Sequence, residues 1–436
     1  MHDDEQSASP AETDTEPQSP LWEVVPLDRF ERPSEPTGET VRKGLKGVWR
    51  SLLGAPDTEP ESMDGAQVPH PTVGQAVVDR AAPPPDWSGP ATALELALAD
   101  WPEADGQTMS ACLIVGPPHG GIGETLRHWA WMRGWRVLEA PDPEAILTGA
   151  EDWQEQLADR DAGPAVLPSL EHCYLRHPLG LGLIRRMVAQ LAAPTIPILV
   201  GCDSWAFAFL GRALALQSGV PAPWTLQALD HERTERWLAE MADPALRFHQ
   251  VEGGDLVLPP PLAAVTAATR GHGEGDGEGH DNGGHESEPV SGFCRFLAAY
   301  ARGNPGVIRA IWRHCLEMAA TEEVEQALLD RLGTPAHGIH RVWLDSWQKM
   351  RLPTLIADPP DLDQYFLHTL LVHGGLPEDI LPTVLPAPGT DLGRSLRRLS
   401  ADNIIGEYNG RWQVTGAGYP SVRQVMARQG LLLDAF

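Results

Sequence analysis

Positive charge, cysteine and long apolar runs are all scarce in this sequence of 436 residues. Only 33 residues are Lys or Arg, against 60 Asp or Glu, so the formal net charge is −27. An acidic surface binds nucleic acid poorly unless it carries a local basic patch. No stretch approaches the roughly 20 apolar residues that span a bilayer, and the acidic N-terminus lacks the apolar run of a signal peptide.

The five cysteines are scattered along the chain, and no CxxC pair occurs. An odd and dispersed set favours neither a disulfide framework nor a zinc site of the usual spacing. We therefore expect buried, reduced thiols and a cytoplasmic protein. The length allows about three domains, and the abundant glycine and proline indicate loops or disorder.

Most of the negative charge falls in segments of low complexity. Residues 1–40 carry eleven acids and two arginines, and residues 55–90 repeat this Pro- and acid-rich composition. Such segments bury too little apolar surface to offset chain entropy, so the sequence predicts a disordered acidic tail over residues 1–90. The Gly-, His- and acid-rich tract 271–289 predicts a solvated insert, with loose metal binding by its histidines as the alternative. Together these segments account for most of the net charge and leave −7 for the rest of the chain.

A short basic segment, residues 41–53, interrupts the acidic tail. It contains four Lys or Arg residues and no acid, and its apolar residues recur at helical spacing. This pattern predicts an amphipathic helix with one apolar and one basic face. Three alternatives stay open: the helix packs on the protein's own core, docks on a protein partner, or makes peripheral contact with an anionic membrane surface. Two internal glycines weaken it as an isolated helix.

A buried strand, a glycine-rich loop and a helix follow one another from residue 111. Ala111–Val115 is a short apolar run typical of a parallel strand. The loop that follows reads GPPHGGIGET, and the next helix starts near Leu126. Strand, loop and helix form the context of a phosphate-binding loop, in which backbone N–H groups and the helix N-terminus hold the anion. Gly116, Gly121 and Gly123 are the candidate cradle.

Two residues of this loop depart from the usual phosphate-binding pattern. Pro118 stands at the position of the first glycine, and Glu124 replaces the lysine that reaches the β- and γ-phosphates. A glutamate repels phosphate at this distance, so we expect nucleotide binding without efficient hydrolysis. Thr125 remains a candidate ligand for Mg²⁺. The alternative is a glycine turn that holds no nucleotide.

Two carboxylates follow later strands of the same pattern. Glu171 lies shortly after the strand Ala165–Leu167 and is the candidate catalytic carboxylate, or a surface cap of the next helix. Asp203 ends the strand Ile196–Cys202 and would face the γ-phosphate, because ligands bind outside the carboxyl ends of such sheets. It is equally placed to cap the helix that begins next.

Beyond this core the chain resembles the AAA+ and related STAND classes of P-loop ATPases. Leu226–Leu238 is similar to the capped helix that enters their helical lid, and Gly303-Asn304-Pro305 to the segment that opens a later lid helix. The resemblance implies a lid over residues 226–350, ATP or ADP with Mg²⁺ as cofactor, and Arg302 or Arg309 as a sensor of the nucleotide.

The departures from the family pattern imply a degenerate ATPase. Pro118, Glu124 and Ser169 all stand where phosphate and magnesium chemistry takes place in that class. The resemblance therefore implies a nucleotide-binding regulatory switch, or a pseudo-ATPase that serves as a scaffold, rather than an efficient enzyme.

The C-terminal region, residues 351–436, has the element order of a winged helix. The sequence predicts three helices over 365–372, 377–385 and from 390 onward, and then a hairpin over 404–414. The dipeptide Asn409-Gly410 is the preferred type I′ turn of such a hairpin.

Four arginines of this region are candidates for contact with a partner. Three lie on the third predicted helix and one in the hairpin, so they could contact phosphates of nucleic acid. The acidic chain favours a protein partner instead, although a nucleic-acid-binding regulator remains the alternative. The four are Arg394, Arg397, Arg398 and Arg411.

Together these patterns predict an α/β protein with three folded parts. A parallel-sheet P-loop core over residues 91–225 precedes the helical lid and the winged helix. The predicted function is a nucleotide-dependent switch or scaffold for a protein partner, with a nucleotide-free scaffold as the alternative.

Overall fold

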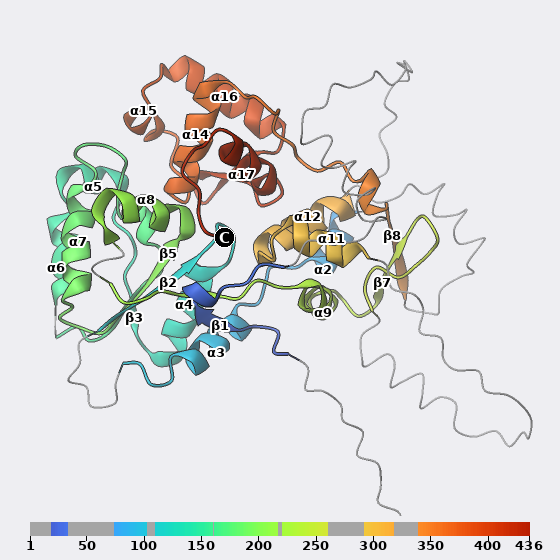
Figure 1. Cartoon of the computed structure of the whole chain (residues 1–436), viewed down its shortest axis with the longest axis horizontal. Coiled ribbons are helices and arrows are strands. Elements are labelled where there is room, and N and C mark those ends of the chain that lie inside the picture. Colours follow the sequence, from blue (N-terminus) through green and yellow to red (C-terminus); the bar gives the residue numbers. More distant parts are fainter. Residues whose placement is uncertain are drawn as a thin grey trace, which may run out of the picture.

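The computed structural model describes seven stretches of the chain (Figure 1). The basic segment 41–53 and the tract 271–289 lie outside them. Within the described residues, no helix is long and apolar enough to cross a membrane. The described stretches are residues 19–33, 74–102, 110–159, 161–216, 220–259, 292–317 and 339–436.

A six-stranded, mostly parallel sheet forms the centre of the fold, in the order β1-β6-β2-β5-β4-β3. The five strands from β6 to β3 pair in parallel, and β1 pairs antiparallel with β6 at one edge. The α/β class with a parallel sheet is thus confirmed. The strands are β1 (Val24–Pro26), β2 (Ala111–Gly116), β3 (Arg136–Val137), β4 (Ala165–Leu167), β5 (Ile198–Asp203) and β6 (Trp224–Leu226).

Helices cover both faces of this sheet, as parallel strands require. Alternate residues of β2 point to opposite faces: Cys112 and Ile114 join the apolar cluster of α3 and α4, whereas Leu113 and Val115 join that of α7 and α8. Both faces of the strand are therefore buried, which explains its continuous apolar sequence. The helices of this core are α3 (Ser88–Ala97), α4 (Ile122–Arg133), α5 (Pro143–Thr148), α6 (Glu151–Ala158), α7 (Gly182–Ala192) and α8 (Ser204–Leu214).

The N-terminal region contributes structure where disorder was expected. β1 extends the central sheet, with Val24 opposite Leu226, and α2 (Gln75–Ala81) packs on a later helix. The ring of Trp22 makes an edge contact with that of Trp237, with centroids 5.8 Å apart. The expectation of an unbroken disordered tail over residues 1–90 is therefore wrong at these stretches. The prediction used the composition averaged over forty residues, and this average concealed the short apolar run that forms β1 between acidic residues.

A middle part combines helices with a small parallel sheet of two strands. Trp312 of α12 is fully buried, and its ring makes edge contacts with Phe248 and Phe293. The helices match the expected lid, but β7 and β8 were not predicted, so this part is not purely helical. Its elements are α9 (His231–Met241), β7 (Leu246–Gln250), α11 (Phe293–Tyr300), α12 (Pro305–Glu317) and β8 (His340–Leu344).

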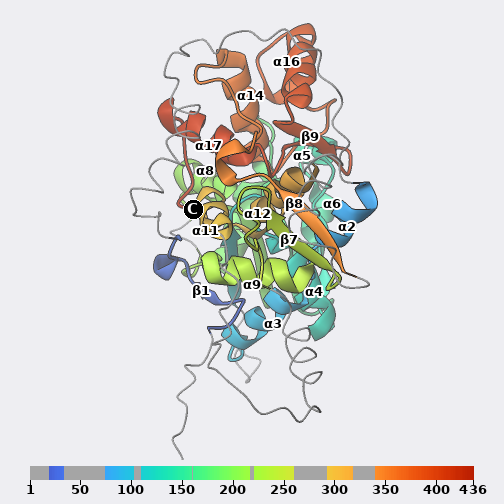
Figure 2. The ribbon, with the colours of Figure 1, turned by 90° about the vertical axis from the view of Figure 1, so that its right-hand side faces the viewer.

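The C-terminal unit, from α14 to α17, contains three helices and then a hairpin, in the order that the sequence predicts, and a further helix follows the hairpin. The hairpin turn has positive φ at both Asn409 (51°) and Gly410 (73°), as a type I′ turn requires. Figures 1 and 2 show this unit above the rest of the described chain. Its elements are α14 (Asp361–Val372), α15 (Leu381–Val384), α16 (Gly389–Ala401), β9 (Ile405–Tyr408), β10 (Arg411–Val414) and α17 (Tyr419–Arg428).

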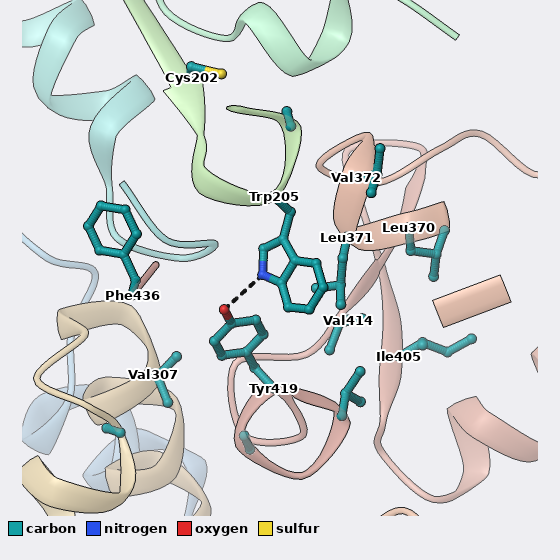
Figure 3. Close-up of a cluster of buried hydrophobic side chains, with 14 of the residues drawn as sticks. Cys202, Trp205, Val307, Leu370, Leu371, Val372, Ile405, Val414, Tyr419 and Phe436 are labelled. Carbon is teal, nitrogen blue, oxygen red and sulfur yellow. Dashed lines mark hydrogen bonds between the residues drawn. The ribbon is translucent and has the colours of Figure 1, made fainter. Parts of the chain in front are cut away.

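The C-terminal unit docks on the core through a buried and partly polar contact (Figure 3). Trp205 of α8 is fully buried, and its Nε1 donates a hydrogen bond to the Tyr419 hydroxyl at 3.0 Å. The Tyr174 hydroxyl donates to the carbonyl oxygen of Val372 at 2.5 Å. The buried carboxylate of Asp434 accepts from the Ser204 hydroxyl at 2.6 Å. Core and C-terminal unit therefore share one interior.

We expect Trp205→Leu to lower the free energy of unfolding by about 3 kcal/mol, because the substitution leaves a cavity and removes the hydrogen bond to Tyr419. Chemical denaturation measures the change. The matched control is Trp131→Leu: Trp131 is 76% exposed, so its replacement should alter stability by less than about 0.5 kcal/mol. Equal effects of the two substitutions would contradict the docking contact.

Candidate functional site

The glycine-rich loop connects the end of β2 to the start of α4, as the sequence predicted. Gly121 has a φ of +74°, and a Cβ there would lie 2.0 Å from the ring of Trp87. A Cβ on Gly116 would lie 2.4 Å from the side chain of Ile122. Both positions therefore require glycine. The loop brings the N-terminus of a twelve-residue helix, with its unpaired N–H groups, to the edge of the sheet.

A cavity of about 690 Å³ opens at this edge. It lies where β2, β4 and β5 end, which is where open α/β sheets bind ligands. Its walls come from the loop, from α12 and from the C-terminal unit. Among the described residues, its charged lining consists of three carboxylates and three guanidinium groups: Glu124, Glu171, Asp203, Arg127, Arg309 and Arg411.

Glu171 and Asp203 form a half-buried pair of carboxyl groups at the cavity. Glu171 lies in the short helix η2 (Leu170–His172), and its Oε2 accepts a hydrogen bond from the Asp203 backbone N–H at 2.9 Å. Asp203 Oδ1 accepts from the Trp205 backbone N–H at 2.8 Å and so caps α8. Burial raises the pKa of both carboxyl groups, and the nearby Glu171 charge raises that of Asp203 further. The pair therefore tends to retain a proton.

The three guanidinium groups differ in what they bind. Arg127 forms an ion pair with Glu139. Arg309 donates to two backbone carbonyls, those of Pro83 at 2.6 Å and Ala82 at 2.9 Å.

Arg411 donates from Nε and Nη2 to the carbonyl oxygen of Gly375, at 3.2 and 2.9 Å. Burial lowers the pKa of Arg411, and the neighbouring Glu171 opposes this shift.

The loop is held on two sides. The Nε2 of His119 lies 2.9 Å from the carbonyl oxygen of Val414 in β10, so the imidazole donates to it. On the other side, Asn304 Nδ2 donates to the carbonyl oxygen of Pro118 at 2.6 Å. A Cβ on Gly306, at the start of α12, would lie 2.1 Å from the His119 carbonyl oxygen. The middle part and the C-terminal unit both contact the loop directly.

Most of the expected site residues meet at the cavity. These are Gly116, Gly121, Gly123, Glu124, Glu171, Asp203 and Arg309, and Arg411 joins them. Arg302 does not: it donates to the carbonyl oxygen of Phe436 at 2.6 Å and lines a separate, small apolar pocket.

The four arginines of the C-terminal unit do not form one surface. Arg394 and Arg397 are exposed on α16, and Arg398 pairs with the buried carboxylate of Asp363. Arg411 points instead into the cavity, because the hairpin folds over the loop. The contact of these arginines with nucleic acid or a protein partner stays a prediction, and Arg411 would reach a partner only at the cavity.

Thr125 has a buried hydroxyl group that is available as a ligand for a metal ion. Its hydroxyl oxygen is buried without a hydrogen-bond partner in the described structure, whereas buried polar groups are normally bonded. Among the described residues, no group of three or more His, Cys, Asp or Glu could hold a metal by itself. Mg²⁺ would therefore bind together with phosphate oxygens, which is its usual mode. The residues fit a magnesium-bound polyphosphate better than a free ion.

Sequence reasoning missed three residues of the site. Trp87 packs on Gly121, His119 bonds to β10, and His172 lies 3.4 Å from the carbonyl oxygen of Gly374. His119 stands inside the loop motif, but its partner is 295 residues away. No local signal predicts such a contact.

Buried histidines make the stability of this arrangement dependent on pH. Burial lowers the pKa of His119 to about 4 and of His172 and His373 to about 3. Because an unfolded histidine titrates near 6.5, the unfolded chain takes up protons below that pH and the folded chain does not. The neutral histidines therefore contribute to the stability of the fold above pH ~6.5, and this contribution is lost as the pH falls toward ~4. The raised pKa values of Glu171 and Asp203 act in the opposite direction.

We expect His119→Gln, which keeps a side-chain donor for Val414, to flatten this dependence. Between pH 7 and pH 5 the wild type should lose about 2 kcal/mol more stability than the variant. Urea unfolding at a series of pH values measures the stability of both proteins. The contributions of Glu171 and Asp203 are the same in both, so they cancel when the two pH profiles are subtracted. Parallel pH profiles for the two proteins would show that His119 is not a buried neutral imidazole.

No known protein family and no curated protein matches the sequence. Several solved structures have a similar arrangement of elements. One is the RuvB Holliday junction branch migration motor of Thermotoga maritima, which is 14% identical in sequence. The match covers 80% of this chain and 94% of that chain, and the TM-score is 0.29. The Aeropyrum pernix ORC2 protein in its ADPNP-ADP complexes is 16% identical, with 81% and 98% covered and a TM-score of 0.33. CDC6P from Pyrobaculum aerophilum is 11% identical, with 82% and 99% covered and a TM-score of 0.31. Likeness at this level assigns neither a family nor an activity to this chain.

Proposed function

We propose that the protein is a degenerate P-loop ATPase of the AAA+/STAND kind that binds ATP or ADP and acts as a regulatory switch or scaffold for a protein partner. One observation carries the proposal. A single cavity at the carboxyl ends of the parallel strands contains the glycine-rich loop and is also lined by α12 and the C-terminal unit. A ligand there contacts all three parts of the chain.

The phosphates would bind at the loop and the first turn of α4. The backbone N–H groups of this turn carry partial positive charge and favour an anion. Thr125 and Asp203 would hold Mg²⁺, which supplies positive charge between phosphate oxygens. Arg309, at the wall formed by α12, adds positive charge to the surroundings of the cavity, while its Nε and Nη2 stay bonded to backbone carbonyls.

Efficient hydrolysis is not part of the proposal. Glu124 is exposed and lines the cavity at the lysine position, where its charge opposes that of the phosphates. A general base must be ionised to accept a proton from water. The burial that raises the pKa of Glu171 disfavours its ionised form.

The proposed switch follows from the shared walls of the cavity. The C-terminal unit can be docked on the core or undocked from it. If nucleotide binds one of these arrangements more tightly, it shifts the equilibrium toward that arrangement, by the ratio of the two affinities. The surfaces that the C-terminal unit presents to a partner would change with it. The alternative, a nucleotide-free scaffold, predicts the same docking with no response to nucleotide.

We expect Glu124→Lys to strengthen ATP binding about tenfold or more, because it replaces a repulsive charge by an attractive one near the phosphates. Calorimetric titration with ATP and ADP in the presence of Mg²⁺ measures the affinities. The matched control is Glu151→Lys, the same charge change at an exposed residue of α6 outside the cavity, which should leave binding unchanged. If neither the wild type nor Glu124→Lys gives saturable heat, the nucleotide-free scaffold is correct.

A further inference from the structure

The loop lacks a cation of its own for a polyphosphate. Glu124 occupies the lysine position, and the cavity also holds Glu171 and Asp203. Apart from Mg²⁺, the loop itself offers only backbone N–H groups to offset the phosphate charges next to these carboxyl groups. A strong site therefore needs a positively charged side chain from elsewhere in the chain.

Two of the three arginines at the cavity are already committed. The Arg127 guanidinium is paired with a carboxylate, Glu139, through both Nη atoms, one of them at 2.8 Å from Oε2. Arg309 is bonded through Nε and Nη2 to the Pro83 and Ala82 carbonyls. The charge of Arg127 is thus balanced by its carboxylate. The charge of Arg309 interacts with Arg313 and Asp79, which do not line the cavity.

Arg411 also donates from Nε and Nη2, but among the described residues both of these hydrogen bonds go to a single oxygen, the carbonyl of Gly375. The guanidinium therefore keeps Nη1 for a ligand, and it lines the cavity from the hairpin. The side chain is partly buried, so its charge is less screened than that of an exposed arginine.

The surroundings of Arg411 place its charge at the phosphate end of the cavity. Burial lowers the pKa of Arg411, and the acidic group that opposes this shift is Glu171, whose carboxyl group accepts a hydrogen bond from the Asp203 backbone N–H at the end of β5. The same hairpin strand reaches the loop through the contact between Val414 and His119. Arg411 and the loop thus belong to one rigidly connected wall.

We propose that Arg411 is the phosphate-binding cation of this site, supplied across the cavity by the hairpin in place of the lysine that the loop lacks. The inference rests on the proposed nucleotide function and deepens it. The ligand class is a nucleoside diphosphate or triphosphate, whose terminal phosphates face the guanidinium. The nucleotide site is complete only while the C-terminal unit is docked. By linkage, the nucleotide then stabilises docking as much as docking strengthens nucleotide binding.

The test compares ATP, ADP and AMP binding by calorimetry in the wild type, Arg411→Ala, Arg411→Lys and the control Arg397→Ala. Arg397 is exposed on α16, away from the cavity. We expect Arg411→Ala to weaken ATP and ADP about tenfold or more and AMP less than about threefold. Arg411→Lys should recover part of the loss, and Arg397→Ala should bind as the wild type does.

A double-mutant cycle tests the replacement of the missing lysine. When Glu124→Lys supplies a cation from the loop, Arg411→Ala should cost much less affinity than it does alone. An equal cost in both backgrounds would contradict the replacement. Thermal unfolding of each free protein accompanies the titrations. If Arg411→Ala does not fold, Arg411→Gln and the Lys substitution carry the comparison.

The outcomes separate this inference from the function beneath it. Unchanged ATP affinity in Arg411→Ala, with a wild type that binds, overturns the role of Arg411 and leaves the proposed function intact. Absence of saturable binding in the wild type and in Glu124→Lys overturns both. An equal loss for ATP, ADP and AMP indicates a structural effect on the cavity and also overturns the phosphate contact.

Discussion

The C-terminal unit docks on the carboxyl edge of the sheet through buried polar contacts, and these contacts hold its hairpin over the glycine-rich loop. Trp205 of α8 is buried against Tyr419 and donates a hydrogen bond to it. The buried Asp434 carboxylate, which follows α17, accepts from the Ser204 hydroxyl of α8 at 2.6 Å. Breaking such buried polar contacts leaves unsatisfied groups, each of which costs about 1–3 kcal/mol. Docking is therefore specific in geometry and is not a loose apolar contact.

This docking also defines the cavity. Without the hairpin, the glycine-rich loop would lie at an open sheet edge, and His119 would lose its acceptor at Val414. With the hairpin in place, the loop, the carboxyl pair of Glu171 and Asp203, and Arg411 line one cavity that is partly open to solvent. Electrostatic interactions are stronger between partly buried groups than in bulk water. The stability of the fold, the shape of the cavity and the position of the C-terminal unit therefore depend on the same contacts.

The sequence predicts the features that local patterns encode. Each of these patterns determines the backbone conformation of a short stretch, and the structure contains all of them. They are the apolar runs of β2, β4 and β5, the glycines of the loop and the Asn409-Gly410 turn. The sequence does not predict β1, β7 or β8, whose three to five residues are defined by pairing partners distant in sequence. It also does not predict that Arg411 lines the cavity, because the direction of its side chain depends on how the hairpin packs.

If the loop and the C-terminal unit share one cavity that responds to nucleotide, nucleotide should protect both of them. Backbone hydrogen exchange of the full chain, with and without ATP and Mg²⁺, measures this protection, because it reports the opening of each segment separately. We expect nucleotide to slow exchange in the loop at residues 116–125 and also in β9 and β10. Slower exchange confined to the loop, with exchange in the hairpin unchanged, would show that the hairpin takes no part in nucleotide binding.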